Sequence, residues 1–198
     1  MMQNRHPRKR AQAGFSLIEL MIAGALMVTG ALAVMGLIMI AIATNSRNKI
    51  DSTKTMLAEA VIEEVSSTLI GNGEAALSDC AGNTFTINAT TGGSKLLGSG
   101  THPSDTLGNN IDFNESAPPS GYQMDYVVTS PCNSTGQYIA TYDVRWHVDQ
   151  IGAGAGTLTN SFLLTVGARK KGASQTGPLA GVYFSPPVNL RVVLGRPE

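Results

Sequence analysis

Residues 14–43 read GFSLIELMIAGALMVTGALAVMGLIMIAIA. From Leu20 to Ala43 this stretch has 24 consecutive residues without a charge, and Thr29 carries its one polar side chain. At about 1.5 Å per helical residue the segment spans roughly 36 Å, which exceeds the ~30 Å hydrocarbon core of a bilayer. The segment therefore predicts a transmembrane helix at about residues 20–43.

The charges on either side of this segment predict its orientation. The 198-residue chain has 14 basic and 14 acidic residues, but Arg5, Arg8, Lys9 and Arg10 all precede the apolar stretch. An excess of Lys and Arg close to a membrane span keeps that end in the cytoplasm. We therefore expect the basic leader, residues 1–14, to stay on the cytoplasmic side of a single membrane pass, and the chain beyond Arg47 to be exported.

Two kinds of proteolytic processing are compatible with a basic leader before an apolar segment. Ala41-Ile42-Ala43 matches the small-residue site of an ordinary secretory signal peptide. The apolar run, however, is much longer than the 7–15 residues of a normal signal peptide, and the carboxylate of Glu19 stands at its start. Both features favour a retained helix.

The other processing site is the string Gly14-Phe15-Ser16-Leu17-Ile18-Glu19 after the basic leader. Here the sequence resembles the type IV pilin and pseudopilin family, whose members carry G-F-x-x-x-E before a long apolar helix. The resemblance implies that a prepilin peptidase cuts between Gly14 and Phe15 and methylates the new N-terminal amine of Phe15. It also implies that Glu19 meets the Phe15 amine of a neighbouring subunit in a filament.

Physical chemistry gives Glu19 the same role. An ionisable side chain near the centre of a membrane costs at least ~2.5–3.5 kcal/mol and usually has a partner. Cleavage after Gly14 creates a cationic amine four residues before Glu19, on the same face of a helix that includes both residues. We therefore predict that Glu19 supplies the carboxylate of the charge pair that forms during filament assembly.

The helix is predicted to continue beyond the membrane, over residues 15–70 in all. Apolar residues recur with a period near 3.6 between Ser52 and Ile70, and Gly71-Asn72-Gly73 provides a stop signal. The members of this apolar stripe are Leu57, Val61, Val65 and Leu69, with Met56 and Ile62 at its flanks. A short coiled-coil dimer is the alternative to packing against a globular head.

Residues 71–198 are predicted to form the exported head. Turn-forming residues dominate 78–119, which we expect to be a glycine-rich, largely irregular loop. A two-residue period follows, and four strands are expected within a sheet at 121–195: residues 122–128, 138–148, 161–170 and 181–195, the last interrupted by Pro186-Pro187. The expected fold class is α+β, with a long N-terminal helix packed on an antiparallel sheet.

The strand with Tyr142, Val144, Trp146 and Val148 extends the resemblance. A Y-x-V-x-W-x-V strand, a loop and two further strands look like the minor pilins of the PilV kind. That likeness implies a structural subunit that primes or caps a type IV pilus, moves from the inner membrane to the pilus surface, and has prepilin peptidase and other pilins as partners. A type II secretion pseudopilin, or a signal-anchored periplasmic binding or adhesion module that never polymerises, are the alternatives.

The chain has two cysteines, Cys80 and Cys132, and both lie in the predicted exported head. An even count in an oxidising compartment predicts a disulfide, and two free buried thiols are the alternative. The sequence has no CxxC and no Cys/His cluster, so no zinc site is predicted.

No enzymatic activity and no cofactor are predicted. The three histidines are His6 in the leader, His102 before a proline, and His147 on a strand, and no catalytic or nucleotide-binding motif is present. The balanced net charge argues against general nucleic-acid binding, and no nucleic-acid partner is predicted.

Two polar clusters in the sequence are interpreted as ordinary solvent-exposed residues rather than as binding sites. Asn110-x-Asp112-x-Asn114-Glu115 has part of the spacing of a calcium loop but lacks its turn glycine and distal glutamate, which favours a solvated loop. Arg169-Lys170-Lys171 offers contacts to phosphate or lipid, but three basic residues at a strand end usually form a soluble edge.

Overall fold

The computed structural model describes residues 14–71, 75–98, 109–129, 131–132, 139–151, 161–172 and 185–195. The predicted leader lies outside the described residues except for Gly14, and so do His6 and His102. Residues 1–44 and residues 45–198 form two compact units, which are described separately below.

One helix, α1, runs over Leu17–Gly71. It begins two residues later than predicted, because Ser16 occupies the capping position. The Ser16 carbonyl accepts the backbone N–H groups of Glu19 and Leu20 at 3.0 and 3.1 Å, and serine is among the residues preferred at this position. The end of the helix at Gly71 agrees with the predicted stop signal.

The second half of α1 packs against the head through one face. Leu57, Val61 and Val65 are fully buried, which confirms the predicted apolar stripe, while the side chain of Leu69 lies outside the described residues. Met56 was expected at the flank of the stripe but is 55% exposed, because its position one residue before Leu57 rotates it about 100° around the helix.

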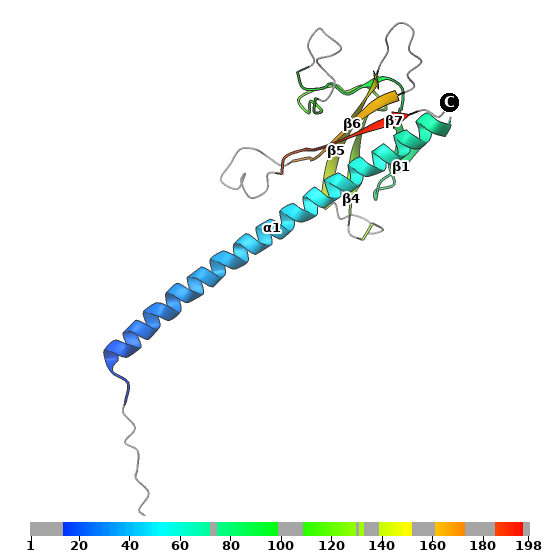
Figure 1. Ribbon diagram of the computed structural model, residues 1–198. Helices are drawn as coiled ribbons and strands as arrows, with labels where there is room; N and C mark the ends of the chain where they lie inside the picture. The colour runs from blue at the N-terminus through cyan, green and yellow to red at the C-terminus, as the bar shows by residue number, and fades with distance from the viewer. Residues whose placement is uncertain are drawn as a thin grey trace, which may run out of the picture. The chain divides into compact units, whose positions relative to one another are not determined.

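Among the described residues, five antiparallel strands form the main sheet, which lies against this part of α1 (Figure 1). They are β3 Gly92–Gly93, β4 Gln123–Val128, β5 Ala140–Ile151, β6 Ser161–Lys170 and β7 Val188–Gly195. A separate hairpin consists of β1 Ala75–Ser78 and β2 Thr84–Ile87. The four strands predicted from the alternating pattern are thus present, and the α+β fold class is confirmed. The last of them, β7, begins only at Val188, after the Pro186-Pro187 pair that was expected to interrupt it. Residues 138 and 181–184 of the predicted strands lie outside the described residues.

Strand β5 is the centre of the sheet. Its one edge pairs with β6 along Tyr142–Ile151, and its other edge pairs first with β4 and then with the short β3. Tyr142, Val144, Trp146 and Val148 face α1 and belong to the main core. Because side chains alternate along a strand, Asp143 and Arg145 lie on the opposite face of the sheet.

The segment 78–119 is more ordered than the predicted loop. Its described residues include β2, β3 and a backbone bridge between Leu96 and Ile111. Gly93 has φ +131°, and a Cβ there would lie 2.5 Å from the carbonyl oxygen of Trp146. Gly93 thus allows a close backbone approach of β3 to β5. A turn-rich composition does not distinguish such a short strand from a loop.

Candidate functional site

The N-terminal candidate site contains Gly14, Phe15 and Glu19. Phe15 precedes the helix and is 85% exposed, and Glu19 lies in the first turn of α1. Phe15 was predicted to lie within the helix, but α1 begins at Leu17, so Phe15 precedes the helix that carries Glu19.

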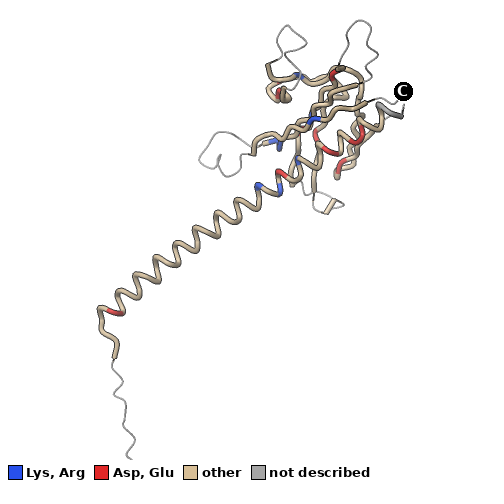
Figure 2. Tube along the Cα trace, in the orientation of Figure 1, with Lys and Arg blue, Asp and Glu red and all other residues tan. Residues whose placement is uncertain are grey.

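The helix that follows this site is apolar and exposed. All residues from Gly14 to Ile42 are exposed, and the mean hydropathy of its most apolar 18-residue window is 2.5. Between Glu19 and Arg47 no residue carries a charge, as the uniformly tan part of the tube shows (Figure 2). By length and composition this helix is able to cross a membrane.

The polar side chain within this helix, Thr29, is satisfied locally. Its hydroxyl donates to the carbonyl oxygens of Ala25 and Leu26, at 3.1 and 3.0 Å. A hydroxyl that bonds back to its own helix leaves no donor in need of water, which suits hydrocarbon surroundings. Glu19 is the one charged side chain between Gly14 and Ser46.

In the head, the structure joins the two predicted partners Cys80 and Cys132 in a disulfide, with Cα atoms 4.8 Å apart. Cys80 follows β1, and Cys132 follows β4. The Cys80 N–H also donates to the carbonyl of Val127 at 3.2 Å. The bridge therefore fastens the β1–β2 hairpin to the end of β4.

Cys80→Ser should lower the free energy of unfolding of the head by about 2–4 kcal/mol, because the bridge closes a long loop in the unfolded chain. Fluorescence of Trp146, the single tryptophan and a fully buried one, reports unfolding in urea for the full chain in detergent micelles. The double variant Cys80→Ser/Cys132→Ser should match the single variant. Alkylation of both thiols in unreduced wild-type protein would contradict the bridge.

Asp79 fastens the same hairpin electrostatically. Its carboxylate accepts hydrogen bonds from the backbone N–H groups of Ala81, Asn83 and Val127 and from the Asn83 amide. Burial acts to raise the pKa of Asp79, but these hydrogen bonds outweigh burial, and the pKa is lowered from its ordinary value of 3.8. The ionised form is therefore the one that stabilises the hairpin.

The stability of the head should consequently fall in acid. A lowered native pKa contributes stability that is complete above the unfolded value of 3.8 and is lost as pH falls through the native value. We expect the urea midpoint of wild type, followed by Trp146 fluorescence, to drop more steeply between about pH 5 and pH 2 than that of Asp79→Asn. Equal pH slopes in the two proteins would show that Asp79 is not the titrating group.

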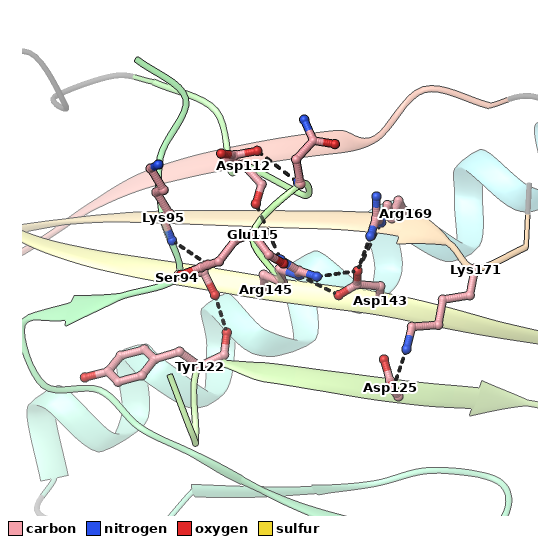
Figure 3. Close-up of polar contacts among 11 residues, drawn as sticks. Ser94, Lys95, Asp112, Glu115, Tyr122, Asp125, Asp143, Arg145, Arg169 and Lys171 are labelled. Carbon is pink, nitrogen blue, oxygen red and sulfur yellow. Dashed lines mark hydrogen bonds and ion pairs between the residues drawn. The ribbon is translucent and has the colours of Figure 1, made fainter. Parts of the chain in front are cut away.

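A buried ionic cluster on the sheet face opposite α1 escaped the sequence analysis. Asp143, which is 1% exposed, accepts two hydrogen bonds from Arg145 at 2.9 and 3.1 Å and one from Arg169 at 3.0 Å. Figure 3 shows the three side chains converging, with α1 behind the sheet. The guanidinium carbons of Arg145 and Arg169 lie 5.5 and 4.7 Å from the centre of the Phe113 ring. Alternation along β5 places Asp143 and Arg145 on the same face of the strand. Their contacts Arg169 and Phe113 are distant in the sequence and become adjacent only in the folded protein.

The acidic loop 110–115 binds this cluster rather than solvent alone. The carbonyls of Asp112 and Glu115 accept hydrogen bonds from Arg145, and Glu115 accepts the backbone N–H of Lys95 (Figure 3). Within the described ranges no group of three or more His, Cys, Asp or Glu side chains is placed to hold a metal ion. The carbonyls and carboxylates of this loop therefore have protein donors as partners.

The basic residues at the end of β6 also have roles within the head. Arg169 pairs with Asp143, and Lys171 pairs with Asp125 at 2.5 Å. His147 lies between the Ser94 carbonyl and the Asp149 carboxylate, at 2.8 and 3.1 Å from its two ring nitrogens. The residues that were expected to form a soluble edge are thus partly engaged in structural pairs.

No family model, curated protein or solved structure matches this chain.

Proposed function

We propose that this chain is a structural minor pilin subunit of a type IV pilus, made as an inner-membrane precursor and processed between Gly14 and Phe15 by prepilin peptidase. After processing, the subunit enters the filament through α1 and takes part in priming or capping filament assembly. The head is displayed first in the periplasm and then on the pilus surface. The proposed role is structural rather than enzymatic.

The observation that carries the proposal is the exposed apolar helix with one carboxylate in its first turn. Every residue from Gly14 to Ile42 is exposed. In water, each exposed side chain of Val, Leu, Ile or Met would forgo about 1.5–3 kcal/mol of burial. A bilayer provides burial for the precursor, and a bundle of like helices provides it for the polymer.

Glu19 distinguishes this proposal from a plain membrane anchor. A helix that only anchors a protein gains nothing from a carboxylate at the start of its apolar segment, because an unpaired charge in the membrane is costly. In a bundle of processed subunits, the amine of Phe15 and the carboxylate of Glu19 on neighbouring copies neutralise each other. Phe15 and Glu19 are both exposed, which supports a contact of these residues with another chain.

Mass spectrometry of sheared surface filaments and of membranes tests the proposal. We expect a mature chain that begins with N-methylated Phe15 in both fractions. A chain that begins at Thr44 would show that ordinary signal peptidase had removed the helix. A methylated chain that is absent from pili but present in a secretion pseudopilus would favour the pseudopilin alternative.

A further inference from the structure

Two outer segments, residues 94–98 and 109–115, contact the face of the sheet that carries Arg145 and His147, opposite α1. A backbone bridge joins the two segments to each other. Three buried apolar side chains of these segments form a second hydrophobic cluster, separate from the main core: Leu96, Ile111 and Phe113. The outer segments thus cover part of this face and close a small core of their own.

Ser94 attaches the first outer segment to the sheet with all three of its polar groups, and the residue is completely buried. Its N–H donates to the Trp146 carbonyl at 2.9 Å, and its hydroxyl donates to the Tyr122 carbonyl at 3.1 Å (Figure 3). Its carbonyl oxygen lies 2.8 Å from Nδ1 of His147. Of these three contacts, the one with His147 depends on the protonation state of a side chain.

His147 faces hydrogen-bond acceptors with both of its ring nitrogens. Nε2 lies 3.1 Å from Oδ1 of Asp149, and Nδ1 faces the Ser94 carbonyl, which can only accept. Turning the ring over would place carbon atoms at both positions, so the two contacts fix its orientation. A neutral imidazole has one N–H and an ionised carboxylate has none. Both contacts are therefore hydrogen bonds only when the pair holds one proton more than a neutral imidazole and a carboxylate.

This extra proton belongs to the His147–Asp149 pair rather than to either residue alone. The two side chains are 19% and 20% exposed, and His147 is the one hydrogen-bond donor to the Asp149 carboxylate among the described residues. Other charged groups face this side of the sheet from β5, from β7 and from the outer segments: Arg145, Arg191, Lys95, Asp112 and Glu115. Within the described ranges, none of them bonds to the His147 or Asp149 side chain.

We propose that the His147–Asp149 pair is a proton-operated latch that holds Ser94, and with it the outer segments, on the sheet. With the proton bound, both hydrogen bonds form and the latch is closed. When the proton leaves, the imidazole keeps one N–H, which the charged carboxylate binds more strongly than a carbonyl does. The buried Ser94 carbonyl then loses its donor, so the contribution of the latch is lost as the pH rises. The inference concerns the head alone and does not rest on the proposed function.

Nitrogen NMR of the full chain in detergent micelles, with isotope-labelled histidine rings, tests the proton count. A titration from about pH 5 to about pH 9 includes the range in which histidine changes charge. We expect Nδ1 of His147 to carry a proton at the acidic end and none at the alkaline end, while Nε2 carries one at the alkaline end. The spectrum of His147→Gln identifies the signals of this residue among the three histidines.

Amide hydrogen exchange measures whether the segment loosens in step with this proton. The protection factor of the Ser94 N–H, taken relative to an unstructured peptide at the same pH, should fall about tenfold as Nδ1 loses its proton, since one hydrogen bond is lost. The Cys80 N–H, which donates to the Val127 carbonyl in another part of the head, is the control and should keep its protection.

Asp149→Asn separates the latch from a general effect of pH. The introduced amide donates to Nε2, so a neutral imidazole can donate from Nδ1 to Ser94 and both contacts persist without the extra proton. Ser94 protection should then stay high throughout the titration. Asp125→Asn, which alters another carboxylate of the same sheet, is the matched control and should behave like wild type.

Trp146 fluorescence verifies that each variant head is folded, and the wild-type titration decides the question even if a variant is not. An Nδ1 that keeps one protonation state throughout would overturn the inference. So would a Ser94 protection factor that does not follow the Nδ1 proton, or a folded Asp149→Asn head that retains the wild-type pH dependence.

Discussion

In cells that carry Gly14→Val, the protein should accumulate in the membrane as the full-length precursor, with mature chain reduced by at least about a hundredfold. The peptidase must bring its catalytic groups to the peptide bond after residue 14, and a branched side chain at that position blocks the approach. A loss of transition-state contact worth about 2.7 kcal/mol already corresponds to that factor. Immunoblotting of membranes, with mass analysis of the N-terminus, measures the ratio.

The structure makes this variant a clean probe. A Cβ at Gly14 would meet no other atom within 4 Å, so valine there disturbs nothing in the described chain. Gly24→Val is the matched control, because Gly24 lies within α1 and also has open space around it. Normal processing of Gly24→Val beside blocked Gly14→Val would place the effect in the peptidase complex. Efficient maturation of Gly14→Val would contradict cleavage at this bond.

The elements predictable from the sequence are those with a regular period. The stripe of Leu57, Val61 and Val65 repeats at the helical period, and the alternation through Tyr142 and Val148 repeats at the strand period. Burial of one face imposes such a pattern directly on the sequence, so these elements and the α+β class follow from it.

Features that depend on partners distant in sequence were not predictable. Lys54 is completely buried on the apolar face of α1, where its ammonium donates to the Ser185 hydroxyl and the Pro186 carbonyl and pairs with Asp51 at 2.7 Å. Ser185 lies 131 residues further along the chain. A lysine in a helix normally indicates solvent, and only the arrival of these acceptors makes its burial tolerable.

The candidate sites in the head also differ in how far their distant partners could be predicted. The even cysteine count predicted a bridge between Cys80 and Cys132, since two cysteines allow one pairing. The buried Asp143 gave no comparable signal, because its partner Arg169 comes from the next strand at a register that the sequence does not specify. The partner of a residue is predictable from the sequence when few partners are possible. An ion pair across a sheet has many possible partners, so it is not predictable in this way.

Glu19→Ala should remove the chain from filaments while leaving its synthesis intact. The change deletes a carboxylate from the exposed first turn of α1 and touches neither the apolar helix nor the head. We therefore expect normal membrane insertion, normal maturation at Phe15 and an unchanged urea midpoint by Trp146 fluorescence. Because incorporation serves priming or capping in the proposed function, fewer filaments of unchanged diameter should also be seen.

The physical reason is the cost of an unpaired ion. Without Glu19, the cationic amine of Phe15 enters an apolar bundle alone, and breaking a buried pair in this way costs about 3–5 kcal/mol. A penalty of that size corresponds to a reduction of at least about a hundredfold in the incorporated fraction. Glu19→Gln, which keeps the volume of the side chain but not its charge, should behave like Glu19→Ala.

Thr29→Ala is the control for altering a polar residue within the same helix. The Thr29 hydroxyl bonds to carbonyls of its own helix, so its removal leaves no unpaired charge and should not change incorporation. Quantitative immunoblots of the membrane and sheared fractions compare the three variants with wild type. Wild-type recovery of Glu19→Ala in the sheared fraction would show that the Phe15 amine enters the filament without this carboxylate, and the charge pair would then have no role in assembly.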